Sequence, residues 1–431
     1  MFIAIGESIV ARAAALGGYI SFSLTACLKT PYEQVHVGTL ITMYSNYSYR
    51  IEACGCQPLL ARRAMGRCGG CAAATAALVA VFVGLLVSGG LKGTGFFPFL
   101  DRLNPAGRGQ QLKGVFPAMH EAEAWGFTLA EMPDLSGQVI FVTGGNVGLG
   151  YWTAHHLAAH GAAVVIGCRS EARCEKAAMQ IRAETASQTV ETALLDLASF
   201  ASIRACASAL AKTHPRLNSL ILNAGVMIPP FGRTAEGLEM QIGVNHFGHF
   251  LLTQLLLPQL EAATAAGVAT IVAVSSNAHF VSYPEGILPS IERMNDEQQY
   301  NRVQAYGQSK LANILFAQEL AARTKDKNIL VNAVHPGAVD TDLLRHAIDW
   351  LPDAISQALL QAYGSFAWHP REAALTQLFA AVSPTLKSQR ITGKYYHPIA
   401  RETTPDPHAA DEEMQRRLWR MTEDFISQQG S

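Results

Sequence analysis

Charged side chains are scarce in this chain of 431 residues. They make up 16% of it, whereas about a quarter is usual for a soluble protein. Hydrophobic residues account for 49%, and the formal net charge is −1. No run of Lys and Arg is long enough to follow a phosphate backbone, which excludes a nucleic-acid-binding function. The shortage of charge suggests instead that part of the chain lies in lipid.

Cysteines are few in the later part of the chain. Five of the eight lie between Cys27 and Cys71, and only Cys168, Cys174 and Cys206 follow. This is not the even framework of a small secreted protein. We therefore expect the later cysteines to be reduced thiols in a cytosol-like or stromal compartment.

No metal site is predicted. The pairs Cys54/Cys56 and Cys68/Cys71 could supply four zinc ligands, but their flanks lack the strand and turn context of a zinc ribbon. Free thiols, or reversible palmitoylation beside an apolar helix, fit these cysteines better.

Residues 71–91 carry no charge. A helix of this length spans a hydrocarbon layer of about 30 Å, so we predict a transmembrane helix; a buried core helix is the alternative. Basic residues flank both ends, which leaves the orientation open. A membrane-anchored protein of the endoplasmic reticulum or another organelle is expected.

The segments around this helix are harder to interpret. Residues 1–70 form an N-terminal extension, which we interpret as a targeting segment, a second membrane-associated helix or an unstructured region. Residues 92–134 are rich in Gly and Pro and predict a linker.

From residue 135 onward, short apolar strands alternate with helical stretches. This alternation predicts parallel strands joined by crossover helices, and their continuous apolar character predicts burial on both faces. We expect a doubly wound α/β Rossmann sheet with three layers over residues 135–400, followed by a C-terminal helical tail over 401–431. Its ligand should bind at the carboxyl ends of the strands. The expected strands are Val139–Thr143, Ala163–Gly167, Ala193–Leu197, Ser219–Leu222, Thr270–Ser275 and Ile329–Val334.

A glycine-rich loop, Thr143–Gly150, lies between the first strand and the first helix. Such a loop lets the backbone approach a pyrophosphate and directs a helix N-terminus at it. The expected cofactor contacts are Gly144, Asn146, Gly148, Leu149 and Gly150.

The end of the next strand reads Gly167-Cys168-Arg169-Ser170, with an arginine where the cofactor ribose is expected. An acidic residue at that strand end would favour NAD, whereas arginine suits the 2′-phosphate of NADP(H). NADP(H) is therefore the expected cofactor, unless Arg169 simply points into solvent.

Tyr306 and Lys310 are four residues apart at the start of a helix-like stretch and so share one face. A phenol titrates near ~10, and a nearby ammonium lowers its pKa. Such a tyrosine can exchange a proton with an alcohol or carbonyl while a nicotinamide exchanges hydride. The spacing is common by itself, but Val274-Ser275-Ser276 ends a preceding strand and can add a hydroxyl.

Together these motifs resemble the short-chain dehydrogenase/reductase family, and within it the retinol-dehydrogenase-like branch. The resemblance covers about residues 135–426. The motifs are TGGNVGLG, CRS, LLDLAS, LNAGVM, GVNHFGHFLLT, VSSNAH, YGQSKLANILFAQEL and HPGAVDTDL, followed by TGKYY and EEMQRRLWRMTEDFI.

The resemblance implies a role for each matching position. Tyr306 would be the general acid/base, Lys310 would lower its pKa and hold the nicotinamide ribose, Ser276 would orient the substrate oxygen, and Asn245 would organise a water next to Lys310. Further cofactor contacts are implied at Asp196 for the adenine, Asn223, Ala224 and Gly225 near the ribose, and Pro336, Val339 and Thr341 for the carboxamide. The fourth-strand motif reads Leu-Asn-Ala-Gly rather than Asn-Asn-Ala-Gly, and the gap from Ser276 to Tyr306 is long.

The segments expected to face the substrate are the loop after Gly225, Asn277–Gln304 and Asp342–Trp368. Apolar walls there suit a lipophilic substrate such as a retinoid, steroid, fatty aldehyde or pigment precursor. We expect an enzyme that acts on CH–OH groups with NADP(H). A nucleotide-binding redox sensor or scaffold without turnover is the alternative, as is a light-dependent pigment reductase, although the substrate segments lack its cysteines. The apolar residues expected to line the pocket are Phe280, Tyr283, Leu343, Leu344, Ile348, Trp350, Leu351, Phe366 and Trp368.

Overall fold

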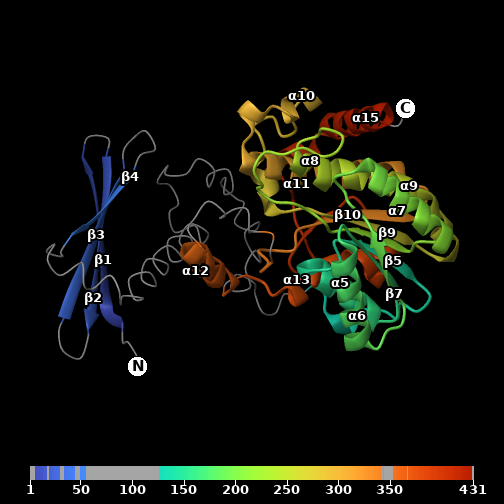
Figure 1. Ribbon diagram of the computed structural model, residues 1–431, viewed down its shortest axis with the longest axis horizontal. Coiled ribbons are helices and arrows are strands. Elements are labelled where there is room, and N and C mark those ends of the chain that lie inside the picture. Colours follow the sequence, from blue (N-terminus) through green and yellow to red (C-terminus); the bar gives the residue numbers. More distant parts are fainter. Residues whose placement is uncertain are drawn as a thin grey trace. The chain divides into compact units, whose positions relative to one another are not determined.

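The computed structural model describes residues 126–341, 343, 353–365 and 367–429, together with the backbone of four strands between residues 5 and 54 (Figure 1). The chain divides into two units, Met1–Thr75 and Ala76–Ser431. The predicted membrane helix at 71–91 and most of the predicted linker lie outside the described residues. Among the helices that are described, none is both long and apolar enough to cross a bilayer.

The N-terminal unit contains an antiparallel sheet in the order β1-β2-β3-β4. Its strands are β1 (Ile5–Leu16), β2 (Tyr19–Lys29), β3 (Gln34–Met43) and β4 (Tyr49–Cys54). The predictions for this segment were a targeting segment, a second membrane-associated helix or an unstructured region, and strands were not among them. An apolar run without clear periodicity does not distinguish a helix from a strand.

The second unit is built on an eight-stranded sheet in the order β12-β11-β10-β9-β8-β5-β6-β7. All neighbouring strands are parallel except β11 and β12, so the predicted Rossmann sheet is confirmed. The strands are β5 (Val139–Thr143), β6 (Ala163–Cys168), β7 (Val190–Leu194), β8 (Ser219–Leu222), β9 (Ala269–Val274), β10 (Ile329–Val334), β11 (Tyr395–His397) and β12 (Arg401–Glu402).

Helices cover both faces of this sheet (Figure 1). Alternate residues of each strand point to opposite faces: Phe141 of β5 packs with α7 (Phe200–Thr213), α9 (His249–Ala263) and α11 (Arg302–Arg323). Ile140 packs with α5 (Gly148–Ala159), α6 (Glu171–Thr185) and α13 (Pro370–Val382). The two apolar cores account for the three layers. The other helices are α8 (Met240–Ile242), α10 (Ile291–Met294), α12 (Asp353–Gly364) and α14 (Pro384–Gln389), with a π-helical turn at Gly243–Gly248 and 3-10 turns at Leu129–Glu131, Thr264–Ala266, Asn277–Val281, Glu297–Gln299 and Pro407–Ala410.

The C-terminal tail folds back as α15 (Glu412–Gln428) onto α9 and α11. The Trp419 ring lies 4.7 Å from that of Phe250 and stacks on Phe316 at 6.0 Å, measured between centroids. Thr422 Oγ1 lies 3.0 Å from His246 Nε2 in a buried hydrogen bond. The predicted helical tail is thus part of the same apolar core.

Strand boundaries differ from the prediction mainly at the edges of the sheet. The third strand is Val190–Leu194, not Ala193–Leu197. Because β7 is an edge strand, Glu191 and Leu194 are exposed and the apolar pattern used for the prediction is interrupted. The short strands β11 and β12 at the opposite edge were not predicted at all, since two or three residues give no periodicity.

Candidate active site

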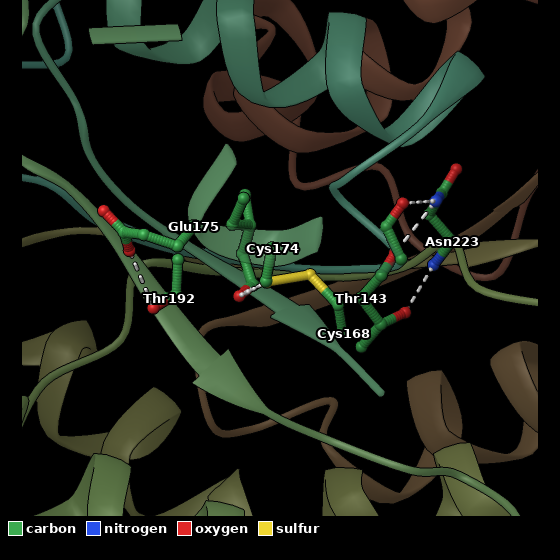
Figure 2. The surroundings of a disulfide bond; sticks show 8 residues. Thr143, Cys168, Cys174, Glu175, Thr192 and Asn223 are labelled. Atoms are coloured by element: carbon green, nitrogen blue, oxygen red, sulfur yellow. Dashed lines mark hydrogen bonds between the residues drawn. A yellow bond between two sulfur atoms is a disulfide. The ribbon is translucent and has the colours of Figure 1, made fainter. Parts of the chain in front are cut away.

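The glycine-rich loop is held in place by the segment that follows β8. The Thr143 hydroxyl accepts hydrogen bonds from the backbone N–H groups of Asn223 (2.9 Å) and Ala224 (3.0 Å). Asn223 Nδ2 donates in return to the carbonyl of Thr143 at 2.8 Å, as Figure 2 shows. These bonds fix the position at which the loop leaves the sheet.

Two glycines of the loop are required by space and backbone conformation. A Cβ on Gly150 would lie 2.3 Å from the carbonyl oxygen of Gly144 and 2.5 Å from Asn223 Nδ2. Gly148 has φ of +54°, and a Cβ there would lie 2.9 Å from Thr341 Cγ2. The loop, predicted to hold the pyrophosphate, and Thr341, predicted to hold the carboxamide, are therefore neighbours. The remaining predicted loop residues, Asn146 and Leu149, lie at the turn and in the first turn of α5.

The residues predicted for the adenosine end of the cofactor lie at the carboxyl ends of adjacent strands. Arg169 follows β6 directly and is exposed. Asp196 follows β7, and its Oδ1 accepts a hydrogen bond from Ala198 N at 2.9 Å. Leu195 N donates to the carbonyl of Cys168 at 2.9 Å, which joins the two strand ends.

Cys168 and Cys174 form a disulfide (Figure 2). The expectation that the later cysteines are all reduced is therefore wrong for this pair, whereas Cys206 is a buried free thiol. The expectation rested on the uneven distribution of cysteines along the chain. It did not consider that a strand end and the next helix bring residues 168 and 174 together.

The predicted reacting residues converge where α11 crosses the end of β9. Lys310 Nζ lies 5.7 Å from the centroid of the Tyr306 ring and donates to the carbonyl of Val274 at 3.0 Å. Ser276, two residues after the end of β9, makes a side-chain hydrogen bond with Tyr306. Tyr306 and Lys310 are both buried. A phenol, an ammonium and a hydroxyl thus share one site.

Burial dominates the electrostatics of this group. It raises the pKa of Tyr306, against a lowering effect of the Ser276 hydrogen bond, and Tyr363 raises it further. Burial also lowers the pKa of Lys310 to about 8. The phenol is therefore protonated at neutral pH, and the expected lowered pKa of Tyr306 is wrong, because burial outweighs the groups that would lower it.

Asn245 lies within the π-helical turn Gly243–Gly248, not at the start of a regular helix. Such turns are often found at functional sites. The Asn245 side chain accepts from Val226 N (2.8 Å) and donates to Val226 O (3.0 Å) and to Ser309 Oγ (2.9 Å). A Cβ on Gly225 would lie 3.1 Å from Asn245 Oδ1 and 3.5 Å from Lys310 Nζ. Asn245 and Lys310 therefore border the same stretch of backbone.

The segment predicted to hold the nicotinamide carboxamide follows β10. Pro336 and Val339 are buried there. Trp368 binds this segment through its backbone, donating to the carbonyl of Ala338 at 2.7 Å and accepting from Asp340 N at 3.1 Å. The Trp368 side chain also packs where a Cβ on Gly337 would lie, 2.5 Å from its Cδ1. Trp368 thus supports the segment predicted to hold the carboxamide, and its predicted place in the wall of the substrate pocket stays a prediction.

Several supporting residues were missed. Gln377 of α13 donates to Asn223 Oδ1 at 3.2 Å, so the Asn223 amide is engaged on both sides and shapes the loop; its predicted ribose contact stays a prediction. Asn313 donates to the same Val274 carbonyl as Lys310, at 3.0 Å. Its place three residues after Lys310 was a usable signal, because positions three apart share a helix face. No comparable signal pointed to Gln377, which lies 154 residues from its partner.

Of the residues predicted to line the substrate pocket, Phe280, Tyr283, Leu343 and Trp368 are described. Phe280 is buried, and Tyr283 packs partly buried against the core that contains α11. The other predicted lining residues, Leu344, Ile348, Trp350, Leu351 and Phe366, lie outside the part of the chain whose side chains are described.

Comparison with known proteins agrees with this geometry. Residues 138–288 and 290–352 match the short chain dehydrogenase family. Retinol dehydrogenase 14 of Mus musculus is 41% identical over 303 residues, which cover 68% of this chain and 86% of that protein. The chain belongs to the short-chain dehydrogenase family. Retinol dehydrogenase 12 of Homo sapiens is 38% identical, over 78% of this short-chain dehydrogenase and 97% of its own length.

A solved structure extends the similarity to three dimensions. An uncharacterized protein from Mycobacterium paratuberculosis is 30% identical and matches with a TM-score of 0.53, over 70% of this chain and 98% of its own. The resemblance to the retinol-dehydrogenase-like branch is confirmed by the curated relatives. This short-chain dehydrogenase is accordingly an oxidoreductase that interconverts alcohols and carbonyls with a nicotinamide cofactor.

Proposed function

We propose that this short-chain dehydrogenase interconverts a lipophilic alcohol and its carbonyl compound with NADP(H), and that Tyr306 is the general acid/base. The observation that carries the proposal is the convergence of Tyr306, Ser276 and Lys310 at the end of β9. The alternative, a redox sensor or scaffold without turnover, is not favoured, because binding a nucleotide does not require this set of proton-transfer groups.

The nucleotide site fits a dinucleotide phosphate. The loop between β5 and α5 is built so that a side chain at Gly150 would collide with backbone, and the α5 N-terminus offers free N–H groups to a pyrophosphate. Arg169 is exposed at the end of β6, where a guanidinium can bind a 2′-phosphate bidentately.

The chain's own residues carry out the proton transfer. When bound, the cofactor supplies or accepts hydride. Tyr306, protonated at neutral pH because it is buried, donates its proton to the carbonyl oxygen in the reducing direction. The Ser276 hydroxyl orients the same oxygen, and the charge of Lys310 stabilises the phenolate that forms. Asn245, which borders the backbone at Gly225 as Lys310 does, holds a water that returns the proton in this proposal.

The lipophilic substrate class rests on the apolar substrate-side segments and on the relatives, which are named retinol dehydrogenases. Within the class, a retinoid is our first candidate. We further propose that residues 71–91 anchor the enzyme to a membrane, where such substrates partition.

The direct test is a panel of carbonyl substrates with NADPH and product identification. We expect turnover of retinal and long-chain aldehydes in detergent, with kcat/KM well above that for small polar ketones. Turnover of polar carbonyls alone would contradict the substrate class. Absence of any turnover, together with tight NADP⁺ binding, would favour the sensor alternative.

Replacing Arg169 by alanine should raise KM for NADPH at least about tenfold, because a charge-assisted hydrogen bond to phosphate contributes about 1.5–3 kcal/mol. KM for NADH should hardly change. Arg173, exposed in the first turn of α6, gives the matched control: Arg173→Ala should keep the wild-type preference. Equal KM changes for both cofactors in Arg169→Ala would show that Arg169 does not select the 2′-phosphate.

The pH dependence of carbonyl reduction should follow Lys310. Its pKa is lowered to about 8, so the ammonium is present below this pH and lost above it. We expect kcat/KM for reduction to be level below about pH 8 and to fall as pH rises through it. Arginine stays charged over this range, so Lys310→Arg should remove the fall while lowering the rate. A wild-type profile that is level up to pH 9.5 would contradict the role of this charge.

A further inference from the structure

The disulfide between Cys168 and Cys174 encloses the residue that we propose selects the cofactor. Cys168 is the last residue of β6, and Cys174 lies in the first turn of α6. The closed loop contains Arg169 and the helix N-cap, Ser170. Figure 2 shows the disulfide together with Thr143, where the glycine-rich loop begins, and Asn223, which follows β8. The bond therefore closes a short covalent loop around Arg169, directly after Gly167, whose carbonyl accepts a hydrogen bond from Gly144 N of the glycine-rich loop.

The Cys168 end of the disulfide is firmly fixed by its backbone. Gly144 N donates to the carbonyl of the preceding residue, Gly167, at 2.7 Å, and Leu195 N donates to the carbonyl of Cys168 at 2.9 Å. The glycine-rich loop on one side and the end of β7 on the other thus hold Cys168 in the sheet.

The first turn of α6 is held much less firmly. Its N-cap Ser170 makes no side-chain capping hydrogen bond, and Glu171, Ala172 and Arg173 are exposed. A backbone bond from Cys174 N to Ser170 O, 2.9 Å long, closes the turn on itself. Cys174 is buried in the core next to β6, and its disulfide to Cys168 covalently closes the exposed stretch between them, Arg169 included, against the end of the sheet.

We propose that Cys168 and Cys174 form a thiol–disulfide modification site that sets the affinity for the adenosine end of NADP(H). With the bond formed, the turn is fixed and Arg169 is preorganised for a 2′-phosphate. With the bond reduced, the uncapped turn gains freedom that cofactor binding must remove. Disulfides in reducing compartments are usually redox-sensing or catalytic. The proposal rests on the proposed NADP(H) site.

Reduction needs a dithiol reductant, which transfers two electrons and two protons to the disulfide and is itself oxidised to a disulfide. A thiolate of the reductant attacks one sulfur, the S–S bond breaks, and the leaving cysteine thiolate takes up a proton. The second thiolate of the reductant then attacks the reductant's own sulfur in the mixed disulfide, which closes the oxidised reductant and releases the other cysteine as a thiolate that takes up the second proton. Because Cys168 is 5% and Cys174 1% exposed, the α6 turn must open before the attack, so we expect reduction to be slow while NADP⁺ is bound.

The bond can be mapped separately from the other cysteines. Trypsin cleaves after Arg169, Arg173 and Lys176, so Cys168 and Cys174 fall in different peptides that only the disulfide links. Mass spectrometry of protein alkylated without reductant should show the linked pair, and treatment with dithiothreitol should release both peptides.

Binding of NADP⁺ is then measured by calorimetry on the full chain, before and after dithiothreitol. We expect Kd to rise at least about fivefold on reduction, the lower end of typical couplings. Cys174→Ser should bind like the reduced protein and no longer respond to dithiothreitol. Cys206→Ser is the matched control, a buried thiol outside the pair, and should respond as wild type does.

The outcomes separate this proposal from the proposed function. Equal Kd values for oxidised and reduced protein, or absence of the linked peptides, would overturn the proposal and leave the NADP(H) site intact. A response to dithiothreitol that persists in Cys174→Ser would assign the effect to other cysteines and overturn it as well. If neither form binds NADP⁺, the proposed function fails, and this inference with it.

Discussion

Replacing Tyr306 by phenylalanine should lower kcat by about a hundredfold to ten-thousandfold, the range that a general acid/base contributes. Phenylalanine keeps the ring packed in its buried position but removes the proton that the carbonyl oxygen receives. The Ser276 hydroxyl loses its partner and cannot replace the phenol, since the charge that forms would no longer lie on a group next to Lys310. Steady-state kinetics with NADPH and retinal measure the effect.

The control for this variant is another buried tyrosine. Tyr396 of β11 packs against Phe379, with ring centroids 5.2 Å apart, in the core on the other side of the sheet. Tyr396→Phe should keep kcat within about a factor of two, because it touches none of the reacting groups. Tyr306→Phe should also bind NADP⁺ with wild-type affinity. Wild-type turnover in Tyr306→Phe would contradict the mechanism, and a loss of NADP⁺ binding would show that the tyrosine supports the site instead.

Much of this site could be predicted because its residues follow strands whose ends meet in space. The strand before Thr143 and the helix after Gly150 identified the nucleotide loop, and Tyr306 and Lys310 were placed on one helix face by spacing alone. Parallel strands with crossover helices bring Ser276, at the end of β9, next to that face. Local sequence patterns were therefore enough to predict a site residue wherever the topology of the sheet brings it next to its partners.

The parts that escaped prediction depend on contacts that no local pattern records. Gln377 reaches Asn223 across 154 residues, and the pair Cys168–Cys174 depends on how tightly the chain turns from β6 into α6. The ionisation of Tyr306 also differed from expectation: spacing suggests a lowered pKa, whereas burial raises it. Desolvation depends on everything packed around the phenol, which spacing along a helix cannot reveal.

Gly150 should be the most sensitive position of the nucleotide loop. A Cβ in Gly150→Ala would lie 2.3 Å from the Gly144 carbonyl oxygen and 2.5 Å from Asn223 Nδ2. The first contact is with backbone and the second with an amide bonded to Gln377, so the loop itself must shift. The N–H groups that should bind the pyrophosphate shift with it. Losing one or two charge-assisted hydrogen bonds, each contributing about 1.5–3 kcal/mol, weakens NADP⁺ binding by a factor between about ten and ten thousand.

Calorimetry with NADP⁺ measures this loss, and thermal unfolding measures the strain that accompanies it. Forcing an added methyl into a packed site costs about 1–3 kcal/mol, so we expect a lower Tm for Gly150→Ala as well. Gly232 is the matched control, because a Cβ there would meet its nearest atoms only at 3.9 Å. Gly232→Ala should leave both NADP⁺ affinity and Tm close to wild type. If Gly150→Ala binds NADP⁺ as well as Gly232→Ala does, the loop between β5 and α5 does not hold the pyrophosphate, and the site must be sought elsewhere along the carboxyl edge of the sheet.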